Sequence, residues 1–87
     1  MIKLVSITPA GPAALDLVFS DGSSGRWSGK ELIGRDTVLT RPLADPDYFA
    51  RAFLEAGALA WPNGLELSAQ SLHRRLSDAG ELRREAA

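Results

Sequence analysis

The stretch WPNGLEL, residues 61–67, carries the clearest fold signal in this chain of 87 residues. Asn63 and Gly64 tolerate the positive φ angles that both central residues of a two-residue type I′ turn require. We therefore expect a β-hairpin in which residues 58–61 fold back on residues 65–67. Trp61 is expected to anchor this hairpin in the core, because large aromatic side chains dominate the packing of a small domain.

The first third of the chain predicts an antiparallel meander. Residues 2–7 favour a strand, and residues 8–12 are expected to end it because they contain two prolines and a glycine. Residues 14–19 alternate in the way that is typical of a strand with one covered face. The Asp21-Gly22 pair suits the next turn, after which residues 25–27 return as a shorter third strand.

Two helices are predicted in the rest of the chain. Asp45-Pro46 is a helix start, because Asp caps free amides and Pro suits the first helical position. This helix is expected to run to Ala56 and to bury Phe49 and Phe53. Ser68 is expected to cap the second helix, which has an apolar stripe and ends at a glycine. The stripe and the terminating residue are Ala69, Leu72, Leu76, Ala79 and Gly80.

Shorter signals lie between and after these elements. Ser28-Gly29-Lys30-Glu31 matches a capping box that would begin one helical turn, ended by Gly34. Residues 35–43 are expected to form a loop, with an edge strand as an alternative around residues 37–39. Residues 81–87 are expected to be a frayed tail.

The composition is that of one small globular domain, which we place at residues 1–80. Hydrophobic residues make up 45% and charged residues 24%, so disorder is not expected. The chain has no cysteine, which favours the cytoplasm, and no apolar run near the roughly 18 residues that cross a membrane. We expect an α+β fold, in which a small antiparallel β meander and a β-hairpin pack with two α-helices.

No catalytic constellation is apparent in the sequence. The single histidine, His73, has no partner at helical spacing, since Asp78 would lie on a different face. One histidine without cysteine leaves a zinc site short of ligands. No serine has the Gly-x-Ser-x-Gly context of a nucleophile elbow. The sequence therefore predicts a protein that is not an enzyme and that has no metal site and no cofactor.

Basic residues near the C-terminus are the one feature that suggests nucleic acid. The candidates are Arg74, Arg75, Arg83 and Arg84. Residues 68–87 hold these four arginines against three carboxylates, a balance of +1 that is typical of a solvated surface with local ion pairs. The net charge of the whole chain is −1, so no global field attracts polyanions. Trp27 is left open between a core position and an exposed binding platform.

Three ordered motifs resemble a bacterial family, domain of unknown function 2442 (DUF 2442). They are Phe19-Ser20-Asp21-Gly22, then Pro42-Leu43-Ala44-Asp45-Pro46 followed by Phe49, then Trp61-Pro62-Asn63-Gly64 followed by Leu65 and Leu72. The resemblance covers roughly residues 3–76 and implies a compact α+β fold with an antiparallel sheet, two helices and no known catalytic residues. The chain departs from the family at Ser28, where members commonly carry an acidic residue, and at Glu66, which replaces a frequent Asp.

These observations predict a non-enzymatic protein-interaction module. The resemblance suggests an antitoxin-like or accessory member of a small two-protein bacterial system. Exposed sheet edges at residues 2–7 and 38–39 are the expected contact sites, with Val5 and Val38 as interaction residues. The partner would be a second copy or another small protein. The alternative is a nucleic-acid-associated transcriptional regulator that uses the C-terminal arginines.

Overall fold

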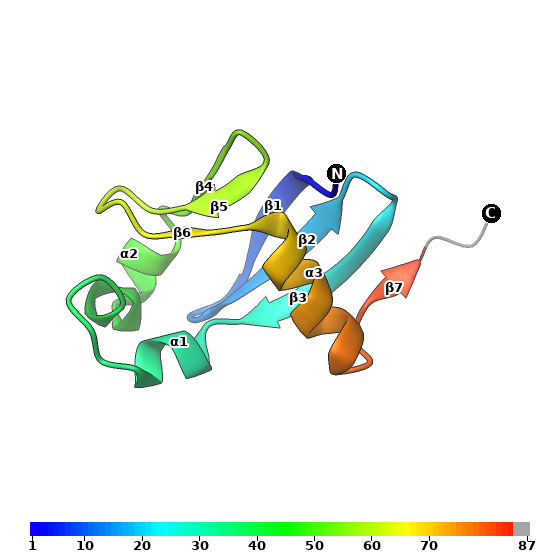
Figure 1. Cartoon of the computed structure of the whole chain (residues 1–87). Helices are drawn as coiled ribbons and strands as arrows, with labels where there is room; N and C mark the ends of the chain where they lie inside the picture. Colours follow the sequence, from blue (N-terminus) through cyan, green and yellow to red (C-terminus); the bar gives the residue numbers. More distant parts are fainter. Residues whose placement is uncertain (85–87) are drawn as a thin grey trace.

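The structure is a computed structural model, and it describes residues 1–84. The part of the chain that it describes forms a four-stranded and a three-stranded antiparallel sheet with three α-helices and one 3-10 helix (Figure 1). This is the predicted α+β class. The elements, in chain order, are β1 (Leu4–Gly11), β2 (Ala14–Phe19), β3 (Ser23–Ser28), α1 (Lys30–Gly34), the 3-10 helix η1 (Arg41–Ala44), α2 (Pro46–Phe49), β4 (Phe53–Glu55), β5 (Ala58–Ala60), β6 (Glu66–Leu67), α3 (Ala69–Asp78) and β7 (Arg83–Arg84).

The larger sheet has the strand order β1-β2-β3-β7, and its first three strands are the predicted meander. β1 continues to Gly11, so the prediction that residues 8–12 end the strand is wrong. Pro9 is opposite Leu15 on an edge strand, where a residue without an N–H is tolerated. The register shifts between Leu4 and Ser6 and again between Pro9 and Gly11, which marks β1 as a bulged edge.

The prediction of a helix from Asp45 to Ala56 is correct for the first turn and wrong beyond it. Asp45 does cap it, with its side chain accepting from the Asp47 amide, but α2 ends at Phe49. The chain then forms β4, in which Phe53 is 41% exposed rather than buried. The reason lies in the turn that follows, because Ala56 and Gly57 both have positive φ, at 51° and 82°. Two such residues close a two-residue hairpin between β4 and β5.

The hairpin around Asn63 and Gly64 is present, but its turn is not the predicted type I′. β5 pairs with β6, and the Trp61 amide donates to the Leu65 carbonyl, so three residues form the connection. Of these, Gly64 alone has positive φ, at 94°. The Gly64 amide donates to the Trp61 carbonyl, the pattern of a three-residue loop that ends in a left-handed residue.

The helix predicted after Ser68 is confirmed as α3. The Ser68 side chain accepts from the Ser71 amide, and Gly80 has positive φ. The Glu81 amide donates to the Leu76 carbonyl and the Gly80 amide to the Ser77 carbonyl, which together form a Schellman cap. Leu72 and Leu76 are buried as expected, whereas Ala79 is exposed because it lies beyond the last helical turn.

Two further predictions are corrected at the helix and strand ends. α1 occupies the predicted turn, but its N-cap is Gly29 and no side chain caps it, so the Ser28–Glu31 capping box does not form. The prediction of a frayed tail is wrong for Arg83 and Arg84, because these two residues form β7 and pair with Ser24 and Ser23 of β3. The remainder of the predicted tail, residues 85–87, lies outside the described residues.

The core lies between the larger sheet, α3 and the short elements that follow β3 (Figure 1). Trp61 is 1% exposed, which confirms its predicted role as the hairpin's anchor. Its indole Nε1 donates to the Phe49 carbonyl at 3.1 Å, and its ring lies 5.7 Å from the Phe49 ring and 6.3 Å from Trp27. These aromatic contacts join the meander, α2 and the hairpin in one core.

Candidate protein-interaction surface

The most exposed large apolar side chain after Met1 belongs to Val38, which is 82% exposed. Val38 and its neighbour Leu39, 42% exposed, lie in the segment from Asp36 to Arg41, which we call the apical loop. This loop connects α1 to η1 at the end of the molecule opposite β7 (Figure 1). The edge strand considered at residues 37–39 does not form, so Val38 is exposed at a loop rather than at a sheet edge.

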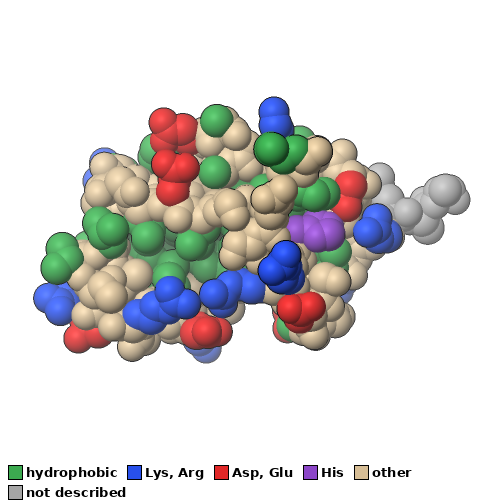
Figure 2. Space-filling view, in the orientation of Figure 1, with side chains coloured by type: hydrophobic (Ala, Val, Ile, Leu, Met, Phe, Trp, Pro, Cys, Tyr) green, Lys and Arg blue, Asp and Glu red, His purple; other side chains and the backbone are tan. Residues whose placement is uncertain are grey.

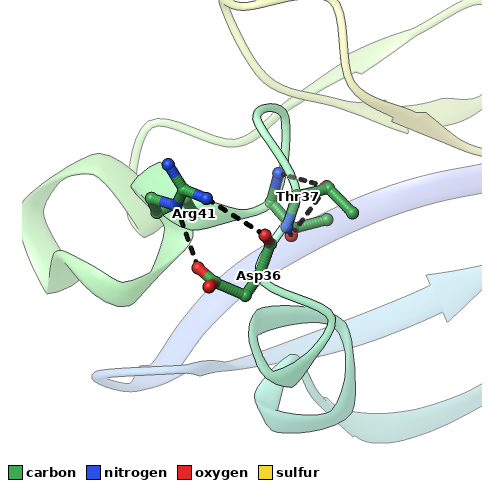
Figure 3. Close-up of polar contacts among 4 residues, drawn as sticks. Asp36, Thr37 and Arg41 are labelled. Carbon is green, nitrogen blue, oxygen red and sulfur yellow. Dashed lines mark hydrogen bonds and ion pairs between the residues drawn. The ribbon is translucent and has the colours of Figure 1, made fainter.

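A reciprocal pair of threonines fixes the backbone of the apical loop (Figure 3). The Thr40 amide donates to Thr37 Oγ1 at 3.2 Å, and the Thr37 amide donates to Thr40 Oγ1 at 3.0 Å. The two hydroxyl oxygens are 2.9 Å apart, and the Arg41 amide donates to the Thr37 carbonyl at 2.8 Å. This is the reciprocal geometry of a capping box, with threonine in place of the usual Glu or Gln.

The base of the apical loop is clamped by Asp36 and Arg41. Arg41 Nε donates to Asp36 Oδ1 at 2.9 Å, and an Arg41 terminal nitrogen donates to the Asp36 carbonyl at 3.2 Å (Figure 3). Asp36 has a φ of 52°, a left-handed conformation that Asp adopts more readily than most residues. Thr40 is only 4% exposed, so this part of the loop is buried against the protein, whereas the Val38 side chain is exposed to solvent.

Asn63 ties the apical loop to the rest of the fold. Its side-chain Nδ2 donates to the Leu39 carbonyl at 3.0 Å, and its amide donates to the Tyr48 hydroxyl at 3.1 Å. Its Oδ1 accepts from the Leu65 amide at 3.2 Å. Asn63 therefore joins the apical loop, α2 and the β5–β6 connection, a role that the turn signal in the sequence did not indicate.

The other predicted interaction residues lie elsewhere. Trp27 is 7% exposed and stacks on Phe49 with ring centroids 6.1 Å apart, so it is a core residue and not a binding platform. Val5 is 56% exposed at the β1 bulge. Next to it, the Leu4 amide donates to the Gly57 carbonyl, so the β4–β5 turn covers the start of this edge.

The turn at Asp21 and Gly22 forms as predicted and is linked to α3. Ser23, which is fully buried, donates both its amide and its hydroxyl to Asp21 Oδ1. His73 has no partner at helical spacing, as expected, but its Nε2 lies 3.1 Å from Asp21 Oδ2, which is 52 positions away in the sequence. The Ser23 hydroxyl and amide, together with His73, lower the pKa of the Asp21 carboxyl to about 2.

The four C-terminal arginines have different neighbours. Arg75 lies 3.7 Å from Glu31 in α1. Arg84 lies 3.6 Å from Asp21 in the turn between β2 and β3. Arg83 borders an open hollow with Asp16 and Arg26. Arg26 makes a two-pronged ion pair with Asp16, and these hydrogen bonds lower the pKa of the Asp16 carboxyl. Arg74 is exposed on α3.

Figure 2 shows one face of the molecule, in the orientation of Figure 1. Hydrophobic side chains gather over the half of this face that holds α1, α2 and β6, and Lys and Arg side chains lie along the border of that half. Within residues 1–84, no three His, Asp or Glu side chains come together in a group that could hold a metal ion. None of the helices in that part of the chain has the length and apolar character needed to cross a membrane.

No family model, curated protein or solved structure matches this chain. The resemblance to family 2442 therefore remains a prediction.

Proposed function

We propose that this chain is a non-enzymatic protein-interaction module that binds its partner through the apical loop. The observation that carries the proposal is Val38, an apolar side chain 82% exposed on a loop held by several hydrogen bonds. Exposed apolar side chains on rigid segments make effective anchors, since a loop that is already ordered loses little conformational entropy on binding.

The loop's chemistry supports a protein partner more than a nucleic acid. Its apical side chains, Val38 and Leu39, offer apolar contact area, and the arginine at its base is already paired with Asp36. Two of the C-terminal arginines, Arg75 and Arg84, lie beside carboxylates, which reduces the positive charge that they could offer to phosphate groups. We include in this proposal an accessory or antitoxin-like role in the cytoplasm beside a second small protein.

Retention of a partner by the tagged protein tests this proposal. The tagged chain is expressed in its source cells, and the purified material is compared with Val38→Asp and with Val5→Asp as a matched control at a second exposed valine. We expect one protein, or an untagged copy of the chain, to be retained in a stoichiometric amount by the wild type and by Val5→Asp. A buried anchor typically contributes about 2 kcal/mol or more, so Val38→Asp should reduce retention by at least roughly tenfold.

Two outcomes would contradict the proposal. One is equal retention of the partner by Val38→Asp and by the wild type, because the apical loop would then not be the contact site. The other is sub-micromolar binding of DNA or RNA at physiological salt that is lost when Arg74 and Arg75 are both changed to alanine. That second result would favour the nucleic-acid alternative.

A further inference from the structure

The single asparagine of the chain precedes a glycine, and this pair is exposed in the connection between β5 and β6. Asparagine is a thermolabile residue, because the backbone nitrogen of the next residue can attack its side-chain amide and close a ring. A glycine at that next position has no Cβ to hinder the attack. The space around Gly64 is open as well, since no other part of the chain lies within 4 Å of the position that a Cβ would take.

A hydrogen bond to Asn63 Oδ1 favours this attack. Oδ1 accepts from the Leu65 amide at 3.2 Å, which folds the side chain back over the Gly64 peptide. Negative charge develops on Oδ1 when the Gly64 nitrogen attacks Asn63 Cγ. The Leu65 N–H therefore stabilises the tetrahedral intermediate in the manner of an oxyanion hole.

Another hydrogen bond slows the attack. The Gly64 amide donates to the Trp61 carbonyl at 3.1 Å, and this N–H must be released before its nitrogen can react. Asn63 and Gly64 are both exposed, and hydrogen bonds in exposed turns open at low free energy. The fold therefore slows the reaction without preventing it.

We propose that Asn63 is a site of spontaneous deamidation, and that this change releases the apical loop from the β5–β6 connection. The Gly64 nitrogen gives its proton to solvent and bonds to Asn63 Cγ. The Cγ–Nδ2 bond breaks, and Nδ2 takes protons from solvent and leaves as ammonium. Water then opens the succinimide ring to give aspartate or isoaspartate at position 63. The sum is amide plus water to carboxylate plus ammonium, with no oxidant and no cofactor.

The product cannot hold the apical loop as the carboxamide does. Asn63 Nδ2 donates to the Leu39 carbonyl at 3.0 Å, whereas a carboxylate only accepts hydrogen bonds. The bonds to Leu65 and Tyr48 use Oδ1 and the backbone amide, which aspartate retains. The change to aspartate therefore removes the bond to the loop selectively. A loop that becomes mobile loses more entropy on binding, so deamidation lowers the affinity for a partner, an effect that rests on the proposed function.

The Asp21-Gly22 pair could form the same ring but is less reactive. An aspartate closes the ring by losing water from its protonated carboxyl group. The Asp21 Oδ1 accepts from the Ser23 amide and hydroxyl, and the pKa of the Asp21 carboxyl is lowered to about 2. This carboxyl is therefore ionised at neutral pH, which leaves Asn63 as the reactive position.

Ageing of the purified protein tests the chemistry. The wild type is incubated at mildly alkaline pH, folded or unfolded in guanidinium chloride, and peptide mass spectrometry follows the carboxylate formed at position 63. We expect aspartate and isoaspartate there, formed in the folded chain at a rate within about tenfold of that in the unfolded chain. Asn63→Gln is the matched control, because its amide must close a larger ring and should react at least roughly tenfold more slowly.

The response of the apical loop is measured separately, on Asn63→Asp. Gln70→Glu is the matched control, because it makes the same change from amide to carboxylate at another exposed position. In Asn63→Asp the backbone ¹⁵N order parameters of Val38 and Leu39 should fall from about 0.85 to below about 0.6. In Gln70→Glu they should remain near the wild-type value. Unchanged amide chemical shifts of the buried Leu72 check that both variants fold.

Two results would overturn this inference. One is a folded chain that deamidates at position 63 more than about tenfold more slowly than the unfolded chain. The other is equal order parameters for Val38 and Leu39 in Asn63→Asp and in Gln70→Glu. Neither measurement uses a partner, so either result leaves the proposed function standing. Conversely, a partner that binds without Val38 would refute the proposed function and leave deamidation and loop release standing.

Discussion

At the scale of single residues, Trp61 is the side chain on which stability depends most. It is 1% exposed, contacts two other aromatic rings and donates a hydrogen bond to the Phe49 carbonyl. Trp61→Ala should lower the free energy of unfolding by about 3–5 kcal/mol, since it leaves a large cavity and an unpaired carbonyl. Urea denaturation measures the change. Phe53→Ala is the matched control, because Phe53 is 41% exposed and should cost much less. A loss below about 1 kcal/mol for Trp61→Ala would contradict this account.

Asp21 makes stability depend on pH. Its pKa is about 2 in the folded chain, against 3.8 as its ordinary value. The folded state therefore binds this proton less readily than the unfolded state, so the stabilisation is complete above about pH 4 and is lost as the pH falls toward 2. The urea concentration at the midpoint of unfolding should decrease in the wild type as the pH is lowered from about 4 to 2, and it should decrease less in Asp21→Asn. Parallel pH profiles for the two proteins would show that Asp21 does not carry this dependence.

Residue contacts between distant segments could not be predicted from the sequence. His73 and Asp21 are separated by 52 positions, and Asn63 and Leu39 by 24. Periodicity reports neighbours on one element only, so the sequence indicates that Asp21 and Asn63 suit turns but not what their side chains reach. Trp61 was predictable as core because its size and apolar neighbours leave few other places for it.

At the scale of elements, signals that are local and unambiguous gave correct predictions. β2 has clear alternation, and α3 has an N-cap serine, an apolar stripe and a terminal glycine, so both form where expected. The segment after α2 was ambiguous. Apolar residues repeat there at helical spacing, at Phe49, Ala52, Phe53 and Ala56. The structure instead has a turn at Ala56 and Gly57, which the sequence did not indicate because alanine rarely adopts a positive φ. The Thr37–Thr40 box was missed because its second residue is not Glu or Gln.

The turn at Ala56 and Gly57 leads to a stabilising substitution. Ala56 has a φ of 51°, which alanine adopts at a cost of roughly 1–2 kcal/mol, whereas Asn tolerates it. Asn-Gly is also the preferred pair for a type I′ hairpin. Ala56→Asn should therefore raise the free energy of unfolding by about 0.5–1 kcal/mol. Thermal denaturation checks this, with Ala44→Asn as the control at an exposed alanine of ordinary φ. An unchanged or lower stability of Ala56→Asn would show that the turn is not strained.

At the scale of the whole molecule, the sequence predicted the class of the fold but not its surface. Val38 was identified as an interaction residue through an edge strand that does not form, and its exposure arises instead from a loop. The position of that loop depends on contacts far apart in the chain, such as the hydrogen bond that the Asn63 side chain donates to the Leu39 carbonyl. Sequence periodicity holds no information about such contacts.

The central claim is that the apical loop is rigid while its apolar side chains are exposed. Backbone ¹⁵N relaxation of the wild type tests this claim most directly, with Thr37→Ala as the comparison because it removes the two hydrogen bonds of Thr37 Oγ1 with Thr40. We predict order parameters of about 0.85 for the amides of Val38 and Leu39 in the wild type, the value of rigid backbone, and lower values in Thr37→Ala. Order parameters below about 0.6 for these two amides in the wild type would contradict the account.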